Sequence, residues 1–365
     1  MELKKYKLGD IAKIEISGVD KKSVDGETPV RLCNFVDVYR NWAITQKLSE
    51  NFMIASAKET EIAKCSIHKG QVAITKDSET RDDIGIPAYI ADDFDNVLLG
   101  YHCALITPND DVLDGKYLNA FMHTRYNQKY FENNASGSGQ RYTLSNETIF
   151  QIPILLPSLE VQKAIGNLLS NIDRKIELNR QINDNLEKMA KQLYDYWFVQ
   201  FDFPNENGRP YKSSGGAMVW NEKLKREIPK EWDNCTLEYY LIIKNGRDHK
   251  HLGNGIYPVY GSGGEIRKVD SFIYSGESIL MPRKGSLNNI MYVNDAFWSV
   301  DTMFYSEMKQ PHCAKYVFYS IKDIDFTRWD SGTGVPSMTS STLYSILLVK
   351  PDADSLAKFD EIITP

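Results

Sequence analysis

Apolar residues recur along residues 158–200 with the seven-residue spacing of a long amphipathic helix. The two positions of this seam carry Ile165, Ile172, Leu186 and Leu193 on one side and Leu169, Ile176, Ala190 and Trp197 on the other. Asn179 and Asn183 fill the two remaining positions. Prolines at 157 and 204 enclose the stretch, which predicts one uninterrupted helix. At a rise of about 1.5 Å per residue it would span roughly 60 Å, which favours a spacer between two domains.

Short β-type runs separated by polar, Gly-rich or Asp-rich turns fill both sides of this helix. Before it, the runs lie at 29–38, 71–76, 86–91 and 97–108, and one helical pattern covers 115–131. After it, β-type runs lie at 257–261, 278–283, 290–294 and 296–306, and a helical pattern lies near 315–321. Strands follow one another instead of alternating with helices, so the pattern excludes a doubly wound sheet.

The two sides of the helix repeat one pattern. Residues 136–139 (SGSG) match 331–334 (SGTG), and residues 149–157 (IFQIPILLP) match 343–351 (LYSILLVKP). Each copy also has a glycine turn that leads into a strand ending on a basic residue. A second, shorter copy of the long helix should therefore begin at 352, and Phe359 and Ile363 fall on its seam.

These patterns predict an α+β protein with two tandem mixed α/β domains and a long coiled-coil helix between them, on which a short C-terminal helix packs back antiparallel. The predicted segments are domain one (1–157), central helix (158–200), an irregular linker rich in Gly, Pro, Ser and Asn (201–231), domain two (232–351) and the short helix (352–365). Two similar modules at a fixed separation suit a ligand with two half-sites. Double-stranded DNA is the commonest such ligand.

Composition narrows the function classes only slightly. The chain has 365 residues, of which 42% are hydrophobic and 25% charged, as in ordinary globular proteins. It has no run of about 18 apolar residues and no signal-peptide pattern, so we expect a cytoplasmic protein without a membrane partner. Its five cysteines are scattered without a CxxC pair, which argues against disulfides. The net charge of −6 lacks the basic surplus of many DNA-binding proteins, so DNA binding must depend on local placement or on charge from another subunit.

Motifs for catalysis or cofactor binding are missing from the sequence. It contains no NPPY, no GxxxxGK[ST] and no HExxH motif, and its adjacent carboxylates lie in turn-like contexts. The pairs His102-Cys103 and His312-Cys313 do not suggest a metal site, because adjacent side chains on a strand or helix point apart. We therefore expect no catalytic residue, no metal and no cofactor in this chain.

Loops at repeat-equivalent positions carry side chains that suit phosphates and base edges. After the matched strands these candidates are Lys76, Ser78, Thr80 and Arg81 in the first copy, and Arg283, Lys284, Ser286 and Asn288 in the second. The other candidates are Tyr39, Arg40, Asn41 and Trp42, then Ser138 and Arg141, then Tyr260, Ser262 and Gly263, and finally Thr333. Each loop is equally well explained as a solvated turn, and Tyr39 and Trp42 equally well as packing residues.

The order of all these features resembles the specificity subunit of type I restriction-modification systems. The resemblance covers essentially the whole chain, through its tandem halves, residues 153–179 (PILLPSLEVQKAIGNLLSNIDRKIELN), residues 195–232 (DYWFVQFDFPNENGRPYKSSGGAMVWNEKLKREIPKEW) and residues 257–264 (YPVYGSGG). It implies two target-recognition domains that each read half of a split, asymmetric DNA sequence. It also implies that two modification subunits dock on the central helix, carry S-adenosylmethionine and methylate adenine. A restriction subunit that translocates DNA with ATP and magnesium can join them.

The short C-terminal segment departs from the family pattern. The family's distal helix is about as long as the central one, whereas only 14 residues follow Pro351. We therefore expect the seam from Ile172 to Trp197 to lack its partner within the chain, and expect the modification subunits or a second copy of the chain to cover it. Three alternatives stay open: a truncated or silent copy, a coiled-coil scaffold without DNA-reading activity, and a stand-alone DNA methyltransferase or nuclease.

Overall fold

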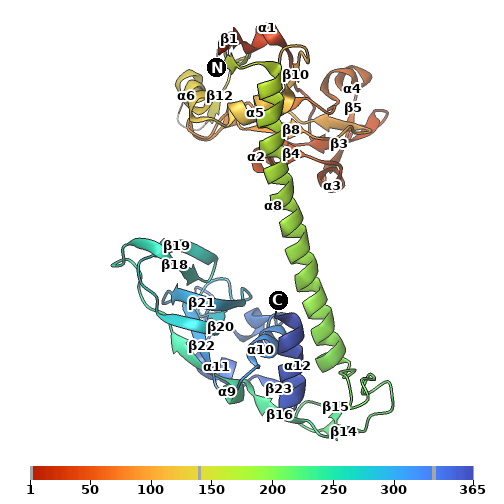
Figure 1. Cartoon of the computed structure of the whole chain (residues 1–365), viewed down its shortest axis with the longest axis vertical. Coiled ribbons are helices and arrows are strands. Elements are labelled where there is room, and N and C mark those ends of the chain that lie inside the picture. Colours follow the sequence, from red (N-terminus) through yellow and green to blue (C-terminus); the bar gives the residue numbers. More distant parts are fainter. Residues whose placement is uncertain (1–2, 139–140, 331–333, 365) are drawn as a thin grey trace. The chain divides into compact units, whose positions relative to one another are not determined.

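A computed structural model describes residues 3–138, 141–330 and 334–364 (Figure 1). The chain divides into two compact units, residues 1–181 and 182–365. The division falls inside the long helix α8 (Leu159–Tyr194). Each unit is built on one mixed β-sheet, which confirms the predicted mixed α/β fold class with a long helix between two tandem domains.

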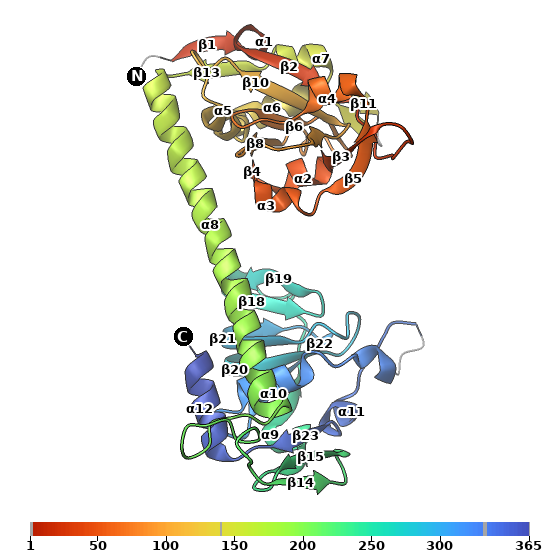
Figure 2. The ribbon, with the colours of Figure 1, turned by 90° about the vertical axis from the view of Figure 1, so that its right-hand side faces the viewer.

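The first unit is organised around a five-stranded sheet with the order β2-β10-β6-β8-β4 (Figure 2). Its strands are β2 (Ala12–Ile16), β4 (Ala43–Ile44), β6 (Val72–Thr75), β8 (Pro87–Ile90) and β10 (Cys103–Pro108). Neighbouring strands are antiparallel except β4 and β8, which are parallel. The unit therefore contains a mixed sheet without a doubly wound order.

Three smaller sheets and seven short helices complete the described part of the first unit. The sheets have the orders β5-β3-β9, β11-β12-β7 and β1-β13. Their strands are β1 (Lys4–Lys7), β3 (Thr28–Cys33), β5 (Met53–Ala57), β7 (Asp77–Ser78), β9 (Val97–Leu99), β11 (Ser136–Ser138), β12 (Arg141–Thr143) and β13 (Pro153–Leu156). The helices are α1 (Leu8–Ile11), α2 (Phe35–Arg40), α3 (Gln46–Ser49), α4 (Glu59–Cys65), α5 (Gly115–Met122), α6 (Arg125–Asn134) and α7 (Asn146–Phe150).

The central strands of this sheet are buried on both faces. In β6, Val72 and Ile74 pack in one hydrophobic core, whereas Ala73 between them packs in another. Since successive side chains of a strand point to opposite faces, the two cores lie on opposite sides of the sheet. Leu118 of α5 belongs to the first core and Val38 of α2 to the second. This double cover explains why the strands read as continuous apolar runs in the sequence.

The second unit contains a six-stranded sheet with the order β17-β22-β20-β21-β18-β19. Its strands are β17 (Leu241–Asn245), β18 (Asn254–Gly261), β19 (Gly264–Val269), β20 (Tyr274–Pro282), β21 (Met291–Ser299) and β22 (Met303–Met308). The described part also has the strand pairs β14-β15 and β16-β23 and, after the end of α8 and the π-helix that continues it, five further helices. The paired strands are β14 (Met218–Asn221), β15 (Arg226–Pro229), β16 (Asp233–Thr236) and β23 (Leu347–Lys350). The helices are α9 (Leu237–Tyr240), α10 (Ala314–Ile321), η2 (Phe326–Trp329), α11 (Ser340–Tyr344) and α12 (Ala353–Ile363).

The internal repeat seen in the sequence is confirmed in the topology. The first five strands of the second sheet follow the order of the first sheet, and β18 and β21 are parallel as β4 and β8 are. The pair β16-β23 corresponds to β1-β13. The hydroxyl of Tyr117 donates a hydrogen bond to the carbonyl oxygen of Leu155 at 2.5 Å, and Tyr316 donates to Val349 at the same distance. The two units are therefore copies of one scaffold.

Helix α8 is attached to the first unit by its first two turns. The side chain of Gln162 is only 1% exposed; its amide nitrogen donates to the carbonyl oxygens of Val112 and Pro157, and its oxygen accepts from the N–H of Asp114. A Cβ atom on Gly166 would lie 2.7 Å from the Cβ of Lys116, so the close approach of α8 to α5 requires glycine here.

The end of α8 packs in the core of the second unit. The helix continues as a short π-helix, η1 (Asp195–Val199), instead of remaining α-helical to residue 200 as predicted. Tyr194, Trp197 and Phe198 are buried and contact the ring of Phe359 on α12, which is 0% exposed. Figure 1 shows α12 running beside the end of α8 in the opposite direction, as predicted. The expectation that Trp197 lacks a partner within the chain is therefore wrong, because α12 covers it.

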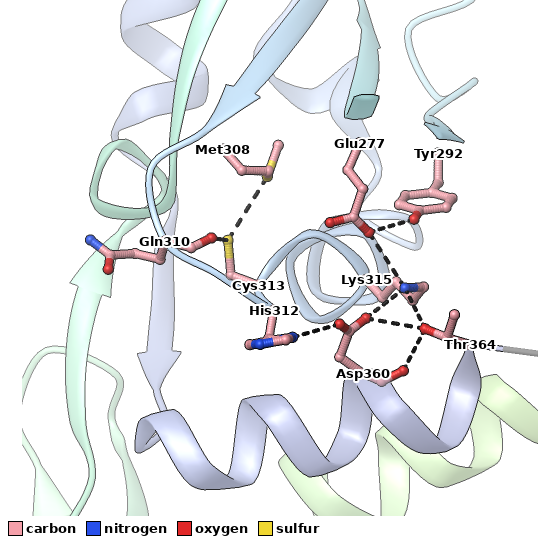
Figure 3. A network of polar contacts seen from close by, with 9 residues as sticks. All are labelled: Glu277, Tyr292, Met308, Gln310, His312, Cys313, Lys315, Asp360 and Thr364. Carbon is pink, nitrogen blue, oxygen red and sulfur yellow. Dashed lines mark hydrogen bonds and ion pairs between the residues drawn. The ribbon is translucent and has the colours of Figure 1, made fainter. Parts of the chain in front are cut away.

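Polar contacts also hold α12 against α10 and the sheet (Figure 3). The carboxylate of Asp360 accepts hydrogen bonds from Lys315 Nζ at 2.5 Å and lies 2.8 Å from His312 Nδ1. Lys315 also lies 3.4 Å from Glu277, which accepts a hydrogen bond from the hydroxyl of Tyr292. Burial alone would raise the pKa of Asp360, but Lys315 and His312 outweigh it and hold that pKa below its ordinary value.

The rest of the predicted seam of α8 is more exposed. Ile165, Ile172, Ile176 and Leu186 are 37%, 47%, 46% and 54% exposed. Leu169 is partly buried, and Leu193 is partly buried against the core of the second unit.

Two predicted segments differ from the structure because local polar side chains end the regular element. The run at 29–38 leaves its strand at Cys33, since Asn34 and Asp37 form a capping box that starts α2. The helical pattern at 115–131 is divided into α5 and α6, because Thr124 takes an extended conformation and its hydroxyl donates to the carbonyl of Phe121 at 2.6 Å.

The predicted irregular linker at 201–231 contains the hairpin β14-β15. Its turn is stabilised by the side-chain oxygen of Asn221, which accepts hydrogen bonds from the N–H groups of Lys223 and Leu224. Lys225 adopts a positive φ of 52° that closes the turn. The segment was predicted as irregular because its many turn residues outweigh the two short strands.

Candidate nucleic-acid interface

The candidate interface lies at one end of each sheet. In the first unit, β10 is antiparallel to both β2 and β6, so these two strands end where β10 begins. In the second unit, β22 has the same relation to β17 and β20. The loops that leave β6 and β20, which carry eight of the eighteen predicted DNA-binding residues, therefore occupy equivalent places.

Lys76 and Arg283, which the repeat pairs, occupy equivalent backbone positions. The N–H of Lys76 donates to the carbonyl oxygen of His102 at 2.7 Å, and the N–H of Arg283 donates to that of Thr302 at 2.9 Å. The carbonyl oxygens of Lys76 and Arg283 accept hydrogen bonds from the segments that precede α7 and α11, respectively. Both loops are therefore held by the same backbone contacts.

In the first unit, pairing of β7 with β12 brings further candidates together. Ser78 lies opposite Tyr142 in this pair, and the guanidinium of Arg81 lies 5.0 Å from the centre of the Tyr142 ring. Nη2 of Arg141 lies 3.2 Å from Oδ2 of Asp77. Thr80 follows in the same loop, and its N–H lies 3.3 Å from the hydroxyl of Ser78. Lys76, Ser78, Thr80, Arg81 and Arg141 therefore form one cluster.

A cavity of about 560 Å³ opens beside this cluster. Its lining residues are Ser17, Gly18, Asp20, Lys76, Asp77, Tyr101 and His102. Asp77 Oδ2 also contacts Nδ1 of His102. Burial raises the pKa of Asp77, but hydrogen bonds from Thr143 and His102 and the charge of Arg141 outweigh it, so the pKa lies below its ordinary value. Asp77 is therefore a carboxylate at neutral pH.

Residues 39–42 do not act as one group. The hydroxyl of Tyr39 donates to the carboxylate of Asp83 at 2.7 Å, which places this ring beside the loop after β7. The amide of Asn41 donates to the carbonyl of Asp37, and Trp42 stacks on His123 with ring centres 4.5 Å apart. Asn41 and Trp42 thus hold the local fold, whereas Tyr39 and the exposed Arg40 stay available to a ligand.

In the second unit, the turn at 260–263 and the loop at 283–289 touch. The carbonyl oxygen of Ser262 accepts a hydrogen bond from the amide of Asn289 at 2.9 Å. Gly285, with a φ of 89°, lies so close that a Cβ there would approach the Ser262 hydroxyl to 2.9 Å. Tyr260 is partly buried in β18, whereas a Cβ on Gly263 would meet nothing within 4 Å. The two predicted groups thus form one surface.

The remaining candidates of the second unit differ in exposure. Arg283 is partly buried, and its guanidinium lies 5.9 Å from the ring centre of Phe304. Lys284 and Ser286 are exposed. The side-chain oxygen of Asn288, also an exposed residue, accepts from the N–H of Phe326 at 2.8 Å. The side chain of Ser138 and the whole of Thr333, also predicted from the sequence, lie outside the described residues.

Equivalent positions carry different side chains in the two units. Asp77 pairs with β12 in the first unit, and Lys284 forms the corresponding bridge with the segment before α11 in the second. By the same alignment, Val335 stands in place of Arg141. The same backbone position therefore presents a paired carboxylate and guanidinium in one unit, and an ammonium group with an apolar side chain in the other.

Sequence reasoning missed the acidic and aromatic members of these surfaces. Asp77 lies in the same loop as Lys76 and Arg81 but was not among the predicted residues. Tyr101 and His102 lie in a different sequence region from Lys76. His102 has a positive φ of 71°, an uncommon conformation outside glycine. Asn289 was the neighbour of a predicted residue. The only sequence signal for Asp77 and Asn289 was their position within the repeat-equivalent loops.

Within the described residues, no group of three or more His, Cys, Asp and Glu side chains could hold a metal ion. His102 faces Asp77, and His312 faces Asp360, while the neighbouring Cys103 and Cys313 are buried. Burial raises the pKa of each of these two thiols to about 12. Across residues 3–138, 141–330 and 334–364, no helix has the length and apolar character needed to span a membrane.

Known proteins identify the family of this chain. A family model described as the type I restriction modification DNA specificity domain matches residues 1–188, more than half of the chain. The chain belongs to this DNA specificity family. Its role as a type I specificity subunit is DNA recognition. The specificity subunit of the type I restriction enzyme MjaIX from Methanocaldococcus jannaschii is 24% identical over 345 residues, which cover 84% of this chain and 74% of the relative.

Two further proteins resemble this specificity subunit. The specificity subunit of the type I restriction enzyme HindI from Haemophilus influenzae is 31% identical over 141 residues, 38% of this chain and 30% of the relative. The crystal structure of a type I restriction-modification S subunit from M. genitalium matches with a TM-score of 0.61 and 16% identity, over 99% of this chain and 88% of that one. This structural likeness supports the fold of two tandem domains with a central helix.

Proposed function

We propose that this specificity subunit reads a bipartite, asymmetric DNA site, with one half-site read by each unit. The observation that supports the proposal is the repeat itself: one scaffold, held by the same hydrogen bonds, presents different side chains at equivalent sheet ends. Because the scaffolds are alike, each loop cluster would contact its own DNA segment in a similar way. Unequal side chains, such as Asp77 and Lys284, would select different bases there.

The chain leaves catalysis to its partners. Two modification subunits, which carry S-adenosylmethionine and methylate adenine, dock on the central helix, and a restriction subunit that uses ATP and magnesium can join them. The exposed apolar stripe of α8, which includes Ile172, Ile176 and Leu186, supports a docking role, since burying such a stripe gains about 25 cal/mol per Å². The subunit itself works in the cytoplasm and binds no cofactor.

Methylome sequencing tests this function in cells that express the chain together with its modification subunits. The expected result is methyladenine within one motif of two specified half-sites and an unspecified spacer. A matched pair of variants, Lys76→Ala in the first unit and Arg283→Ala at the equivalent position of the second, should each relax a different half of that motif.

Two results would contradict the proposal. A continuous motif, or no motif in the presence of active modification subunits, would favour a scaffold without DNA-reading activity. Methylation or cleavage by the purified chain with S-adenosylmethionine alone would show a stand-alone enzyme. Cells with the modification subunits but without this chain provide the control.

A further inference from the structure

Two side chains from separate elements of the first unit meet at the carboxylate of a third. Asp77 belongs to β7, His102 directly precedes β10, and Arg141 begins β12. Nη2 of Arg141 lies 3.2 Å from Asp77 Oδ2, and the imidazole of His102 contacts the same oxygen. The side chain of Asp77 is 15% exposed and that of Arg141 is 58% exposed. The carboxylate is thus a partly buried support, and the guanidinium it holds faces outward.

The contacts of Arg141 leave much of its hydrogen-bonding capacity unused. A guanidinium has five N–H donors in a planar fork. Within the part of the chain that the structure describes, the hydrogen bonds of the Arg141 side chain all use Nη2, which contacts Asp77 and His102. Nη1 and Nε make no hydrogen bond to the described residues, so either of them can form a two-donor edge together with the second N–H of Nη2, and Asp77 restricts the orientations that this edge can take.

A guanidinium held in this way suits the major-groove edge of guanine. Guanine presents two acceptors there, N7 and O6, at the spacing of an arginine fork, whereas other bases do not offer this pair. A fixed orientation reduces the conformational entropy lost on binding and favours the base that fits the fork. The second unit lacks this arrangement, because Lys284 and Val335 stand where Asp77 and Arg141 stand in the first.

We propose that Arg141 is a specificity-determining residue that reads one guanine in the half-site of the first unit, with Asp77 as its positioning residue. This inference depends on the proposed function and names the chemistry of one of its two half-sites. It differs from a structural role, in which the ion pair only holds β12 against β7. A structural role would change stability or affinity at all sites, whereas a reading role changes preference at one base pair.

The test uses the complex of the full chain with its modification subunits and duplexes that carry its methylation motif. Each guanine of both half-sites is replaced in turn by 7-deazaguanine, which lacks the N7 acceptor. For the wild-type complex, one of these replacements should weaken binding by about 5- to 50-fold. Arg141→Ala should bind the unmodified duplex more weakly by a similar factor and should show no further loss on that modified duplex.

Three more variants separate reading from folding. Arg141→Lys retains an ion pair with Asp77 but cannot form the planar fork, so its preference for guanine should be weaker than that of the wild type. Asp77→Asn should methylate sites that carry another base at this position. Lys13→Ala is the matched control, because Lys13 is an exposed cation paired with Glu15 on β2, near the end of β10 remote from His102. It should bind both duplexes as the wild type does.

The outcomes distinguish this inference from the proposed function. The wild-type complex can recognise a bipartite motif and yet lose no more binding than the Arg141→Ala complex on every 7-deazaguanine duplex. In that case the inference is wrong and the function stands. Unchanged base preference in Arg141→Ala would also overturn the inference. If the wild-type complex recognises no bipartite motif, the proposed function fails and the inference fails with it.

Discussion

The two units of this protein have one scaffold and two different surfaces. The order of five strands and the hydrogen bonds that hold the loops after β6 and β20 are the same in both. At the sheet end, however, the first unit presents Asp77 with Arg141, and the second presents Lys284 with Val335. Because backbone hydrogen bonds hold the loops, their side chains can differ without disturbing the cores. A duplicated scaffold can thus carry two recognition surfaces.

The helices that follow the two units show a second difference. By the repeat, Ile165, Gln162 and Gly166 of α8 correspond to Phe359, Leu356 and Asp360 of α12. α8 is attached by a buried amide and a close glycine contact, whereas α12 is attached by a buried aromatic ring and a carboxylate. Equivalent helices are therefore attached to equivalent units by different interactions.

The largest expected effect is the difference in stability loss between replacement of Phe359 and replacement of its repeat equivalent, Ile165. Phe359→Ala removes a fully buried ring and should lower the free energy of unfolding of the second unit by about 3–5 kcal/mol. Ile165→Ala alters a side chain that is 37% exposed and should cost less than about 1 kcal/mol. Urea unfolding followed by tryptophan fluorescence measures the first effect, since five of the six tryptophans lie after residue 181. Equal effects would contradict this difference between the helices.

Replacement of Gln162 tests the attachment of α8. Leucine is the residue that α12 has at position 356, the equivalent of position 162. Gln162→Leu therefore leaves the N–H of Asp114 and the carbonyl of Val112 without their side-chain partner. The expected loss is about 1–3 kcal/mol of local stability. Hydrogen exchange should then accelerate in the first turns of α8. Unchanged exchange would show that the buried amide does not hold this helix.

Arg283→Ala and Lys76→Ala compare the two recognition surfaces. Each should weaken DNA binding of the assembled complex by about 1–3 kcal/mol, because each removes one cation from one loop. The loss should affect sequence preference in one half-site only, a different half for each variant. Binding titrations on duplexes mutated in either half measure this directly. Equal loss of preference in both halves would indicate non-specific phosphate contacts instead.

The smallest effect concerns the pH dependence of the second unit. The pKa of Asp360 is lowered in the folded state, so its stabilising contribution is present above about pH 4, the ordinary pKa of aspartate, and disappears as the pH falls through the lower folded value. Asp360→Asn should cost about 1 kcal/mol at pH 7 and weaken the acid dependence. Fluorescence-detected unfolding from pH 2 to pH 7 measures both. An unchanged pH profile would contradict the role of this carboxylate.

Much of the fold could be predicted because its signals are local. The long helix followed from heptad spacing, and the strands followed from short apolar runs between turns. The repeat of residues 149–157 in residues 343–351 predicted two similar domains, which the strand orders confirm. Errors occurred where a polar side chain interrupts a pattern, as at Asn34 and Thr124. Such caps act within a few residues and leave little trace in hydrophobic periodicity.

The candidate surfaces were only partly predictable. Lys76 and Arg283 were paired correctly as repeat equivalents, because each follows a strand that the repeat aligned. Asp77 was missed as a partner of Arg141, since 64 residues separate them. Trp42, which the sequence predicts equally as a DNA-binding candidate and as a packing residue, stacks on His123. Sequence spacing says which residues share a loop, but it does not say which loops meet.

By itself, the sequence determined the tandem organisation, the long helix and the family, because periodicity, repetition and motif order are properties of neighbouring residues. Only the tertiary structure decided that β7 pairs with β12 and brings Arg141 to Asp77, and that α12 covers Trp197. Strand register and helix packing depend on contacts between residues far apart in the chain. The chemistry that distinguishes the two recognition surfaces arises from those contacts.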